Sequence, residues 1–187
     1  MAPMQCFDFS ELQQQQLLRL ARDSIEQGLN SGSALKANSS DVDPQLLLPR
    51  ACFVTLSINH QLRGCIGTLQ ADEPLLDAVA YYAYSAAFND RRFDPLVADE
   101  LESIDIEISV LSPMQRLEVA NEAELLSLLQ PGVDGLWMEV EHYRSTFLPQ
   151  VWEKLPDPRQ FVEQLKLKAG LAKDYWSDDI QWHTYRV

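Results

Sequence analysis

The chain has 187 residues, of which 46% are hydrophobic, and its formal net charge is −13 at pH 7. This length and apolar content allow one full core, or one larger and one smaller lobe, without disulfides or metals. The acidic balance argues against DNA or RNA as the main partner, because nucleic-acid-binding proteins usually carry a basic face. No apolar run approaches the roughly 18 residues needed to cross a bilayer, and the N-terminus lacks the pattern of a secretory signal. We therefore expect a cytoplasmic protein with no membrane partner.

The first expected element is an amphipathic helix over residues 10–30. Ser10 with Gln13 three positions later is typical of a capped helix start, and apolar residues follow at helical spacing. The next segment, residues 31–44, is rich in Ser, Asn and Asp and is expected to form an exposed loop.

A β-hairpin is expected next, over Ala51–Leu69, where two alternating apolar runs flank a polar turn at residues 59–61. Asp72 is expected to cap a helix that runs to about Phe88. Ser103–Leu111 is the clearest strand, because Ile and Val alternate with polar residues there. That alternation is typical of a sheet with one buried face.

Short helices and strands alternate in the last third of the chain. Helices are expected from Asn121, from Pro149 and over residues 158–171. A second hairpin is expected with strands over residues 135–141 and 146–148, and a last strand over residues 180–187. Hairpins interspersed with helices favour an α+β fold over a doubly wound one. The expected architecture is a mainly antiparallel β-sheet flanked by helices.

The thiols of the first hairpin differ in their expected surroundings. Cys6, Cys52 and Cys65 form no CxxC pair and are odd in number, so reduced thiols are expected. Strand alternation places Cys52 on the apolar face and Cys65 on the face of Arg63 and Gly67.

Two glycines close to Cys65, Gly64 and Gly67, indicate a bulge or a close approach by a ligand or another backbone. Leu62 and Ile66 are expected to point to the other, apolar side. The neighbouring Arg63 favours the thiolate, which is the nucleophilic form of cysteine. The alternative is that Cys65 is only a small residue that fits a tight sheet crossing.

Glu107 is the candidate general base, since it lies on the polar face of the Ser103–Leu111 strand. Otherwise it is a solvent residue on a half-exposed sheet. His60, His142 and His183 show no metal-ligand spacing. The chain has no Gly-rich phosphate loop, dinucleotide fingerprint or ligand cluster, so no cofactor and no metal are expected.

Five sequence blocks, spread over about Leu48 to Tyr185, together resemble the AMMECR-domain family, the system protein A of the AmmeMemoRadiSam gene set. They lie in the family's order and spacing. The blocks are Leu62–Thr68 (LRGCIGT), Ala86–Phe88 with Asp90 and Arg92–Phe93, Ile106–Pro113, Thr146–Val151, and Lys168–Leu171.

The resemblance implies one AMMECR-type domain over residues 1–187, with a larger lobe, a smaller lobe and a cleft between them near the exposed motif. Similar domains are encoded beside, or fused to, a Memo-like protein and a radical-SAM protein, which implies these partners. Carried onto this chain, the family's functional positions are Arg63, Gly64, Cys65 and Gly67, with Asp90, Arg92, Phe93, Glu107 and Gln150 as supporting residues.

Two functions are compatible with these residues. In the leading hypothesis the cleft binds a small anionic substrate, with Cys65 as nucleophile or covalent anchor. Arg63 and Arg92 then orient the ligand, since guanidinium groups suit carboxylate or phosphate, and Glu107 moves the proton. In the alternative, the domain is a non-catalytic partner or delivery module for the Memo-like and radical-SAM proteins.

Overall fold

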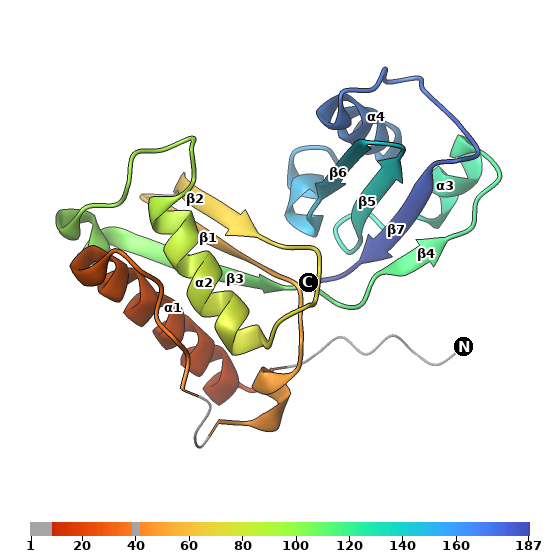
Figure 1. Ribbon diagram of the computed structural model, residues 1–187. Helices are drawn as coiled ribbons and strands as arrows, with labels where there is room; N and C mark the ends of the chain where they lie inside the picture. The colour runs from red at the N-terminus through yellow and green to blue at the C-terminus, as the bar shows by residue number, and fades with distance from the viewer. Residues whose placement is uncertain (1–8, 39–41) are drawn as a thin grey trace. The chain divides into compact units, whose positions relative to one another are not determined.

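The protein, as a computed structural model, is described over residues 9–38 and 42–187 (Figure 1). Its chain forms two compact units, an N-terminal unit that ends at Leu111 and a C-terminal unit over Ser112–Val187. Each unit has its own hydrophobic core and its own antiparallel sheet. The predicted α+β fold is therefore confirmed. No helix within the described ranges is both long and apolar enough to span a membrane.

The N-terminal unit is a three-stranded sheet with two helices on one face (Figure 1). The strand order is β2-β1-β3; α2 packs on β1 and β2, and α1 packs on α2 and β3. The elements are α1 (Glu11–Ser31), η1 (Pro44–Leu47), β1 (Cys52–Ile58), β2 (Gln61–Gly67), α2 (Leu75–Phe88), η2 (Ala98–Ser103) and β3 (Ile104–Val110).

The two helix starts of this unit differ from each other. Ser10 and Gln13 form the predicted capping box of α1. The predicted cap of α2 by Asp72 is wrong, because α2 begins after Pro74 without a side-chain cap. The extended backbone around Pro74 pairs with Pro49, and the Leu48 carbonyl accepts the first helical N–H of α2 at 3.1 Å. A backbone group thus replaces the expected carboxylate.

The predicted hairpin is present, but it contains an irregularity that reorients part of β2. Its two turn residues, Asn59 and His60, both have positive φ, as in the tight turns that suit twisted strands. Leu62 pairs with Ser57, whereas Gly64 pairs with Leu56, so one extra residue of β2 forms a bulge. The bulge separates the faces of Leu62 and Ile66: Ile66 pairs with Val54 and packs on the core, whereas Leu62 points away from the core and is 48% exposed. Its predicted placement on the apolar side is therefore wrong.

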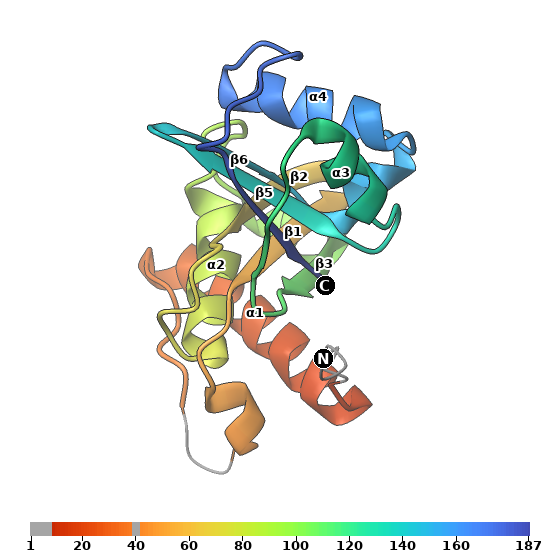
Figure 2. The same cartoon turned by 90° about the vertical axis from the view of Figure 1, so that its right-hand side faces the viewer.

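The C-terminal unit is a four-stranded antiparallel sheet of order β4-β7-β5-β6, with α4 beside β6 (Figure 2). The second predicted hairpin is present as β5 and β6, but β6 begins three residues before Thr146, the expected start of its second strand. The short strand β4 was not predicted. The elements are β4 (Gln115–Leu117), α3 (Glu122–Leu128), β5 (Gly135–Val140), β6 (Tyr143–Phe147), η3 (Pro149–Glu153), α4 (Pro158–Ala169) and β7 (Gln181–Tyr185).

Candidate functional site

Cys65 lies in a row of three side chains that crosses the N-terminal sheet. Cys65 of β2 pairs with Thr55 of β1, which in turn pairs with Glu107 of β3. Paired residues share a face, and their neighbour Gly64 faces Ala86 of α2, so the row lies on the face opposite the helices. The Thr55 hydroxyl donates a hydrogen bond to Cys65 Sγ at 3.3 Å. Glu107 is two strands from Cys65, about 10 Å between Cα atoms, so the Thr55 hydroxyl stands between them.

The backbone of Cys65 is bound on its outer side by Asp90 and Arg92, which follow α2. The Cys65 N–H donates to Asp90 Oδ2 at 2.9 Å, and Arg92 Nη2 donates to the Cys65 carbonyl at 3.1 Å. Arg92 also binds both carboxylate oxygens of Asp90, at 2.9 and 2.6 Å. The hydrogen bonds from the Arg92 side chain and the Cys65 amide hold the pKa of the buried Asp90 far below its usual range, although burial opposes this. Three residues thus form one connected group.

A second arginine–carboxylate pair lies nearby. Arg63 donates from Nε to Glu100 Oε1 at 2.7 Å and from Nη2 to Oε2 at 2.8 Å. This hydrogen bonding raises the pKa of Arg63 and lowers that of Glu100, with burial opposing both shifts. The ring centroid of Phe93 is 6.0 Å from the Arg63 Cζ and 5.5 Å from the Arg92 Cζ. Phe93 therefore links the two pairs by cation–π contacts.

These residues border an open hollow of about 600 Å³ in the N-terminal unit. Two of its three arginines, Arg63 and Arg92, hold carboxylates of the chain, whereas the exposed Arg91 has no ion pair among the described residues. The hollow therefore has less unpaired positive charge than three arginines suggest. It is lined by Arg63, Arg91, Arg92, Phe93, Asp94, Pro95, Val97 and Glu100.

Both glycines beside Cys65 lie against other backbone. A Cβ on Gly64 would be 2.2 Å from the Ala86 carbonyl oxygen of α2, and one on Gly67 would be 2.3 Å from the Cys52 carbonyl oxygen. The predicted close approach is present, and it accounts for both glycines by packing. Their part in ligand binding stays a prediction.

The two described thiols differ as their positions in the hairpin predict. Cys52 is fully buried in the core, and burial raises its pKa to about 12. Cys65 is half-buried, and both thiols are free. Cys6 lies outside the described residues. Cys65 is therefore the better candidate for chemistry.

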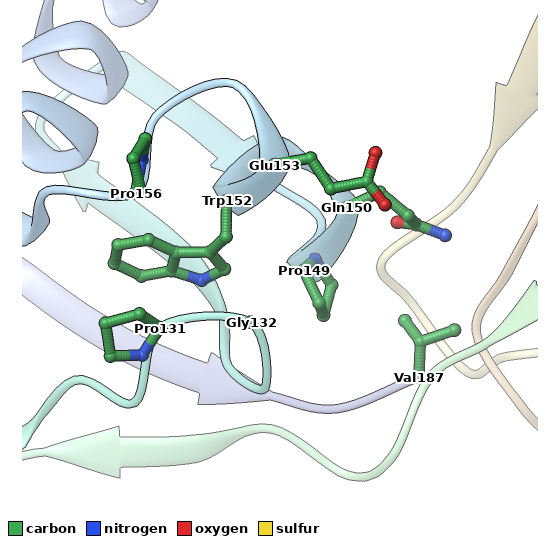
Figure 3. Close-up of a pocket in the computed structure, with 8 residues that line it drawn as sticks. All are labelled: Pro131, Gly132, Pro149, Gln150, Trp152, Glu153, Pro156 and Val187. Atoms are coloured by element: carbon green, nitrogen blue, oxygen red, sulfur yellow. The ribbon is translucent and has the colours of Figure 1, made fainter.

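Gln150 belongs to the C-terminal unit, where it lines a different hollow of about 470 Å³ (Figure 3). The Trp152 indole forms part of this wall, stacked on Phe161 with ring centroids 3.7 Å apart. Figure 3 shows Gln150 and Glu153 projecting from the short helix η3. The other predicted site residues all lie in the N-terminal unit.

Comparison of the sequence and the fold with known proteins shows the family of this chain. The AMMECR1 family profile matches residues 18–187. The chain belongs to the AMMECR1 family. A protein from Methanothermobacter thermautotrophicus is 40% identical over 163 residues, covering 87% of this chain and 84% of the relative. One from Aeropyrum pernix is 32% identical over 195 residues, covering 99% and 81%. The crystal structure of an uncharacterized protein from Pyrococcus horikoshii matches with a TM-score of 0.84 and 33% identity, over 91% of this chain and 86% of that one.

Family membership confirms the resemblance inferred from the five sequence blocks. Within this AMMECR1 domain, the block residues Arg63, Cys65, Asp90, Arg92 and Phe93 form a continuous set of contacts, although 27 positions separate Cys65 from Arg92. The hairpin motif and the segment after α2 therefore belong to one structural site.

Sequence reasoning missed two residues of the AMMECR1 site, Thr55 and Glu100. The partner of Cys65 depends on the bulge, which alternation does not reveal. Glu100 is 37 positions from Arg63, and no local pattern pairs them. Within the described ranges, no group of three or more His, Cys, Asp or Glu residues has the arrangement of a metal site.

Proposed function

We propose that this AMMECR1 domain acts through Cys65 as nucleophile or covalent anchor for a small anionic substrate. Its setting would be a cytoplasmic modification pathway shared with Memo-like and radical-SAM proteins. The observation that carries the proposal is the hydrogen bond from Thr55 Oγ1 to Cys65 Sγ, in a row that continues to Glu107. A hydroxyl that donates to sulfur favours the thiolate and fixes its direction.

The proposed chemical step is addition of the thiol to an electrophilic carbon. Sulfur supplies the electron pair of the new S–C bond, the π bond at that carbon breaks, and its electron pair goes to the attached oxygen or nitrogen, which takes a proton from water. The thiol proton passes through solvent to the carboxylate of Glu107 before the attack, while the Thr55 hydroxyl donates to the thiolate. Glu107 is exposed and lies in the same row, which suits a proton acceptor that exchanges with solvent.

The anionic character of the substrate rests on the arginines of the hollow. Arg91 has no ion pair among the described residues, and Arg63 keeps a buried Nη1 that lacks a hydrogen-bond partner. A carboxylate or phosphate oxygen would accept from the exposed Arg91, and from Nη1 of Arg63 only after a rearrangement that uncovers this buried atom. Because Arg63 and Arg92 already bind carboxylates, we expect affinity for a simple anion alone to be weak.

The first test is the rate of alkylation of each cysteine by iodoacetamide across pH, measured peptide by peptide by mass spectrometry. At pH 8, Cys65 is expected to react at least about a hundredfold faster than Cys52, whose buried thiol is almost wholly protonated. Thr55→Val is expected to slow Cys65 and raise the midpoint of its pH profile, because the donor to sulfur is lost.

Thr55→Ser is the matched control, since it keeps the hydroxyl and should keep the wild-type profile. A Cys65 rate no faster than that of Cys52 would exclude the nucleophile. So would a Cys65→Ala variant that supports the pathway as well as wild type.

One observation favours the second candidate, a non-catalytic partner or delivery module. The arginines of the motif are already ion-paired, and the hollow is bordered by the exposed apolar Val97, as suits a protein contact. Stoichiometric co-purification with the Memo-like or radical-SAM protein that survives Cys65→Ser but not Arg63→Glu would support docking. Co-purification that is lost with Cys65→Ser but kept with Arg63→Glu would favour the covalent role of Cys65.

A further inference from the structure

The segment after α2 binds both outward-facing main-chain groups of Cys65. Sheet order makes β2 an edge strand, and the Cys65 N–H and carbonyl point away from β1, toward Asp90 and Arg92. Asp90 supplies the acceptor and Arg92 the donor that a further strand would have supplied. Cys65 is thus held from both sides, by Thr55 on the sheet and by this pair on the edge.

The pair also places two opposite charges beside the main chain of Cys65, the residue that carries the thiol. Asp90 is 6% exposed, so its charge is poorly screened by solvent, and a nearby carboxylate disfavours a thiolate. Arg92 favours the thiolate, and the charge of Cys65 contributes to the raised pKa of Arg92, after the larger effect of Asp90. Neither residue needs to touch a substrate to influence the sulfur.

We infer that Asp90 and Arg92 are positioning residues that fix the Cys65 peptide and set the ionisation of its thiol through their opposing charges. The functional role of this arrangement rests on the proposed function, since the ionisation of the Cys65 thiol matters for activity only if this thiol reacts. The arrangement itself is testable without a substrate.

The test is the ionisation midpoint of Cys65, read from the 13Cβ chemical shift of labelled cysteine across pH in the full chain. Asp90→Asn removes the negative charge but keeps an acceptor for the Cys65 N–H, so the midpoint should fall by about half to one pH unit. Arg92→Met removes the cation, so the midpoint should rise by a similar amount. A purely structural pair would not move the midpoint in opposite directions.

Hydrogen exchange of the Cys65 amide separates positioning from charge. Arg92→Lys keeps the positive charge but loses the bidentate contact with Asp90. The ionisation midpoint of Cys65 should therefore stay near wild type, while the Cys65 amide exchanges several-fold faster. The control is Arg22→Lys, because Arg22 also binds backbone carbonyls of this unit, those of Leu101 and Ile104, without touching Cys65. It should change neither quantity.

A midpoint that is unchanged or raised in Asp90→Asn overturns the inference. This holds even if Arg92→Met fails to fold, since Asp90→Asn and Arg92→Lys then decide the matter. Slow alkylation of Cys65 together with opposite shifts of its ionisation midpoint would exclude Cys65 as the nucleophile but support the inference about Asp90 and Arg92. Fast alkylation without these shifts would do the reverse.

Discussion

Gly64→Ala is expected to lower the free energy of unfolding of the N-terminal unit by about 3 kcal/mol. The new Cβ would lie 2.2 Å from the Ala86 carbonyl oxygen, so the methyl group meets helix backbone and not a movable side chain. Relief requires α2 to move away from β2, which opens the core beneath Val54 and Leu56. The loss should appear in urea unfolding followed by far-UV circular dichroism, because α1 and α2 both belong to this unit.

Gly32→Ala is the matched control for this substitution. Gly32 has a positive φ but no atom within 4 Å of an added Cβ, so the cost is conformational and about 1 kcal/mol. Equal losses of unfolding free energy in Gly64→Ala and Gly32→Ala would show that the α2 backbone does not lie in close contact with Gly64 in solution.

Glu122→Gln is expected to destabilise the C-terminal unit by about 2 to 3 kcal/mol, because it leaves a buried ammonium without its counter-ion. Lys166 of α4 is fully buried, its Nζ pairs with Glu122 of α3, and its other hydrogen bond is a long one to the Lys173 carbonyl at 3.4 Å. The Trp176 ring, 5.9 Å from Nζ, adds a weak attraction. Tryptophan fluorescence reports this unit selectively, since all four tryptophans lie in it.

The control is Glu118→Gln, which removes an exposed carboxylate paired with Arg116 and should leave the unfolding midpoint unchanged. The double variant Lys166→Met with Glu122→Gln should recover most of the loss, since no buried charge then remains. A Glu122→Gln midpoint equal to that of the Glu118→Gln control would contradict this account.

The fold could largely be predicted from local signals in the sequence, whereas the full set of candidate site residues came from the family resemblance. Alternation in β3 and the capping residues of α1 specify their elements directly, and the α+β class follows from the mixture. The thiol of Cys52 was separated from that of Cys65 by strand parity alone. These inferences need only neighbours along the chain.

The errors arise where a residue's partner is distant or a strand is irregular. A regular register from the turn at Asn59 would pair Thr55 with Gly64, whereas the bulge moves Thr55 to Cys65. The bulge also puts Leu62 and Ile66 on opposite faces, so that Ile66 packs on the core and Leu62 is exposed. The one extra residue of β2 therefore determines which side chain of β1 lies beside the Cys65 thiol. Asp72 failed as a cap because the Leu48 carbonyl, 27 positions before Leu75, takes the first N–H of α2.

The occupied edge of β2 limits how other molecules can be recognised there. An extended peptide joins a sheet by exchanging main-chain hydrogen bonds with an edge strand. At Cys65 both of those groups are already taken by Asp90 and Arg92. Strand addition is therefore blocked at the motif, for a peptide and for a second copy of the chain alike. For the small anionic ligand proposed above, selectivity would then come from side chains, so ligands would be distinguished by functional group and not by a peptide backbone.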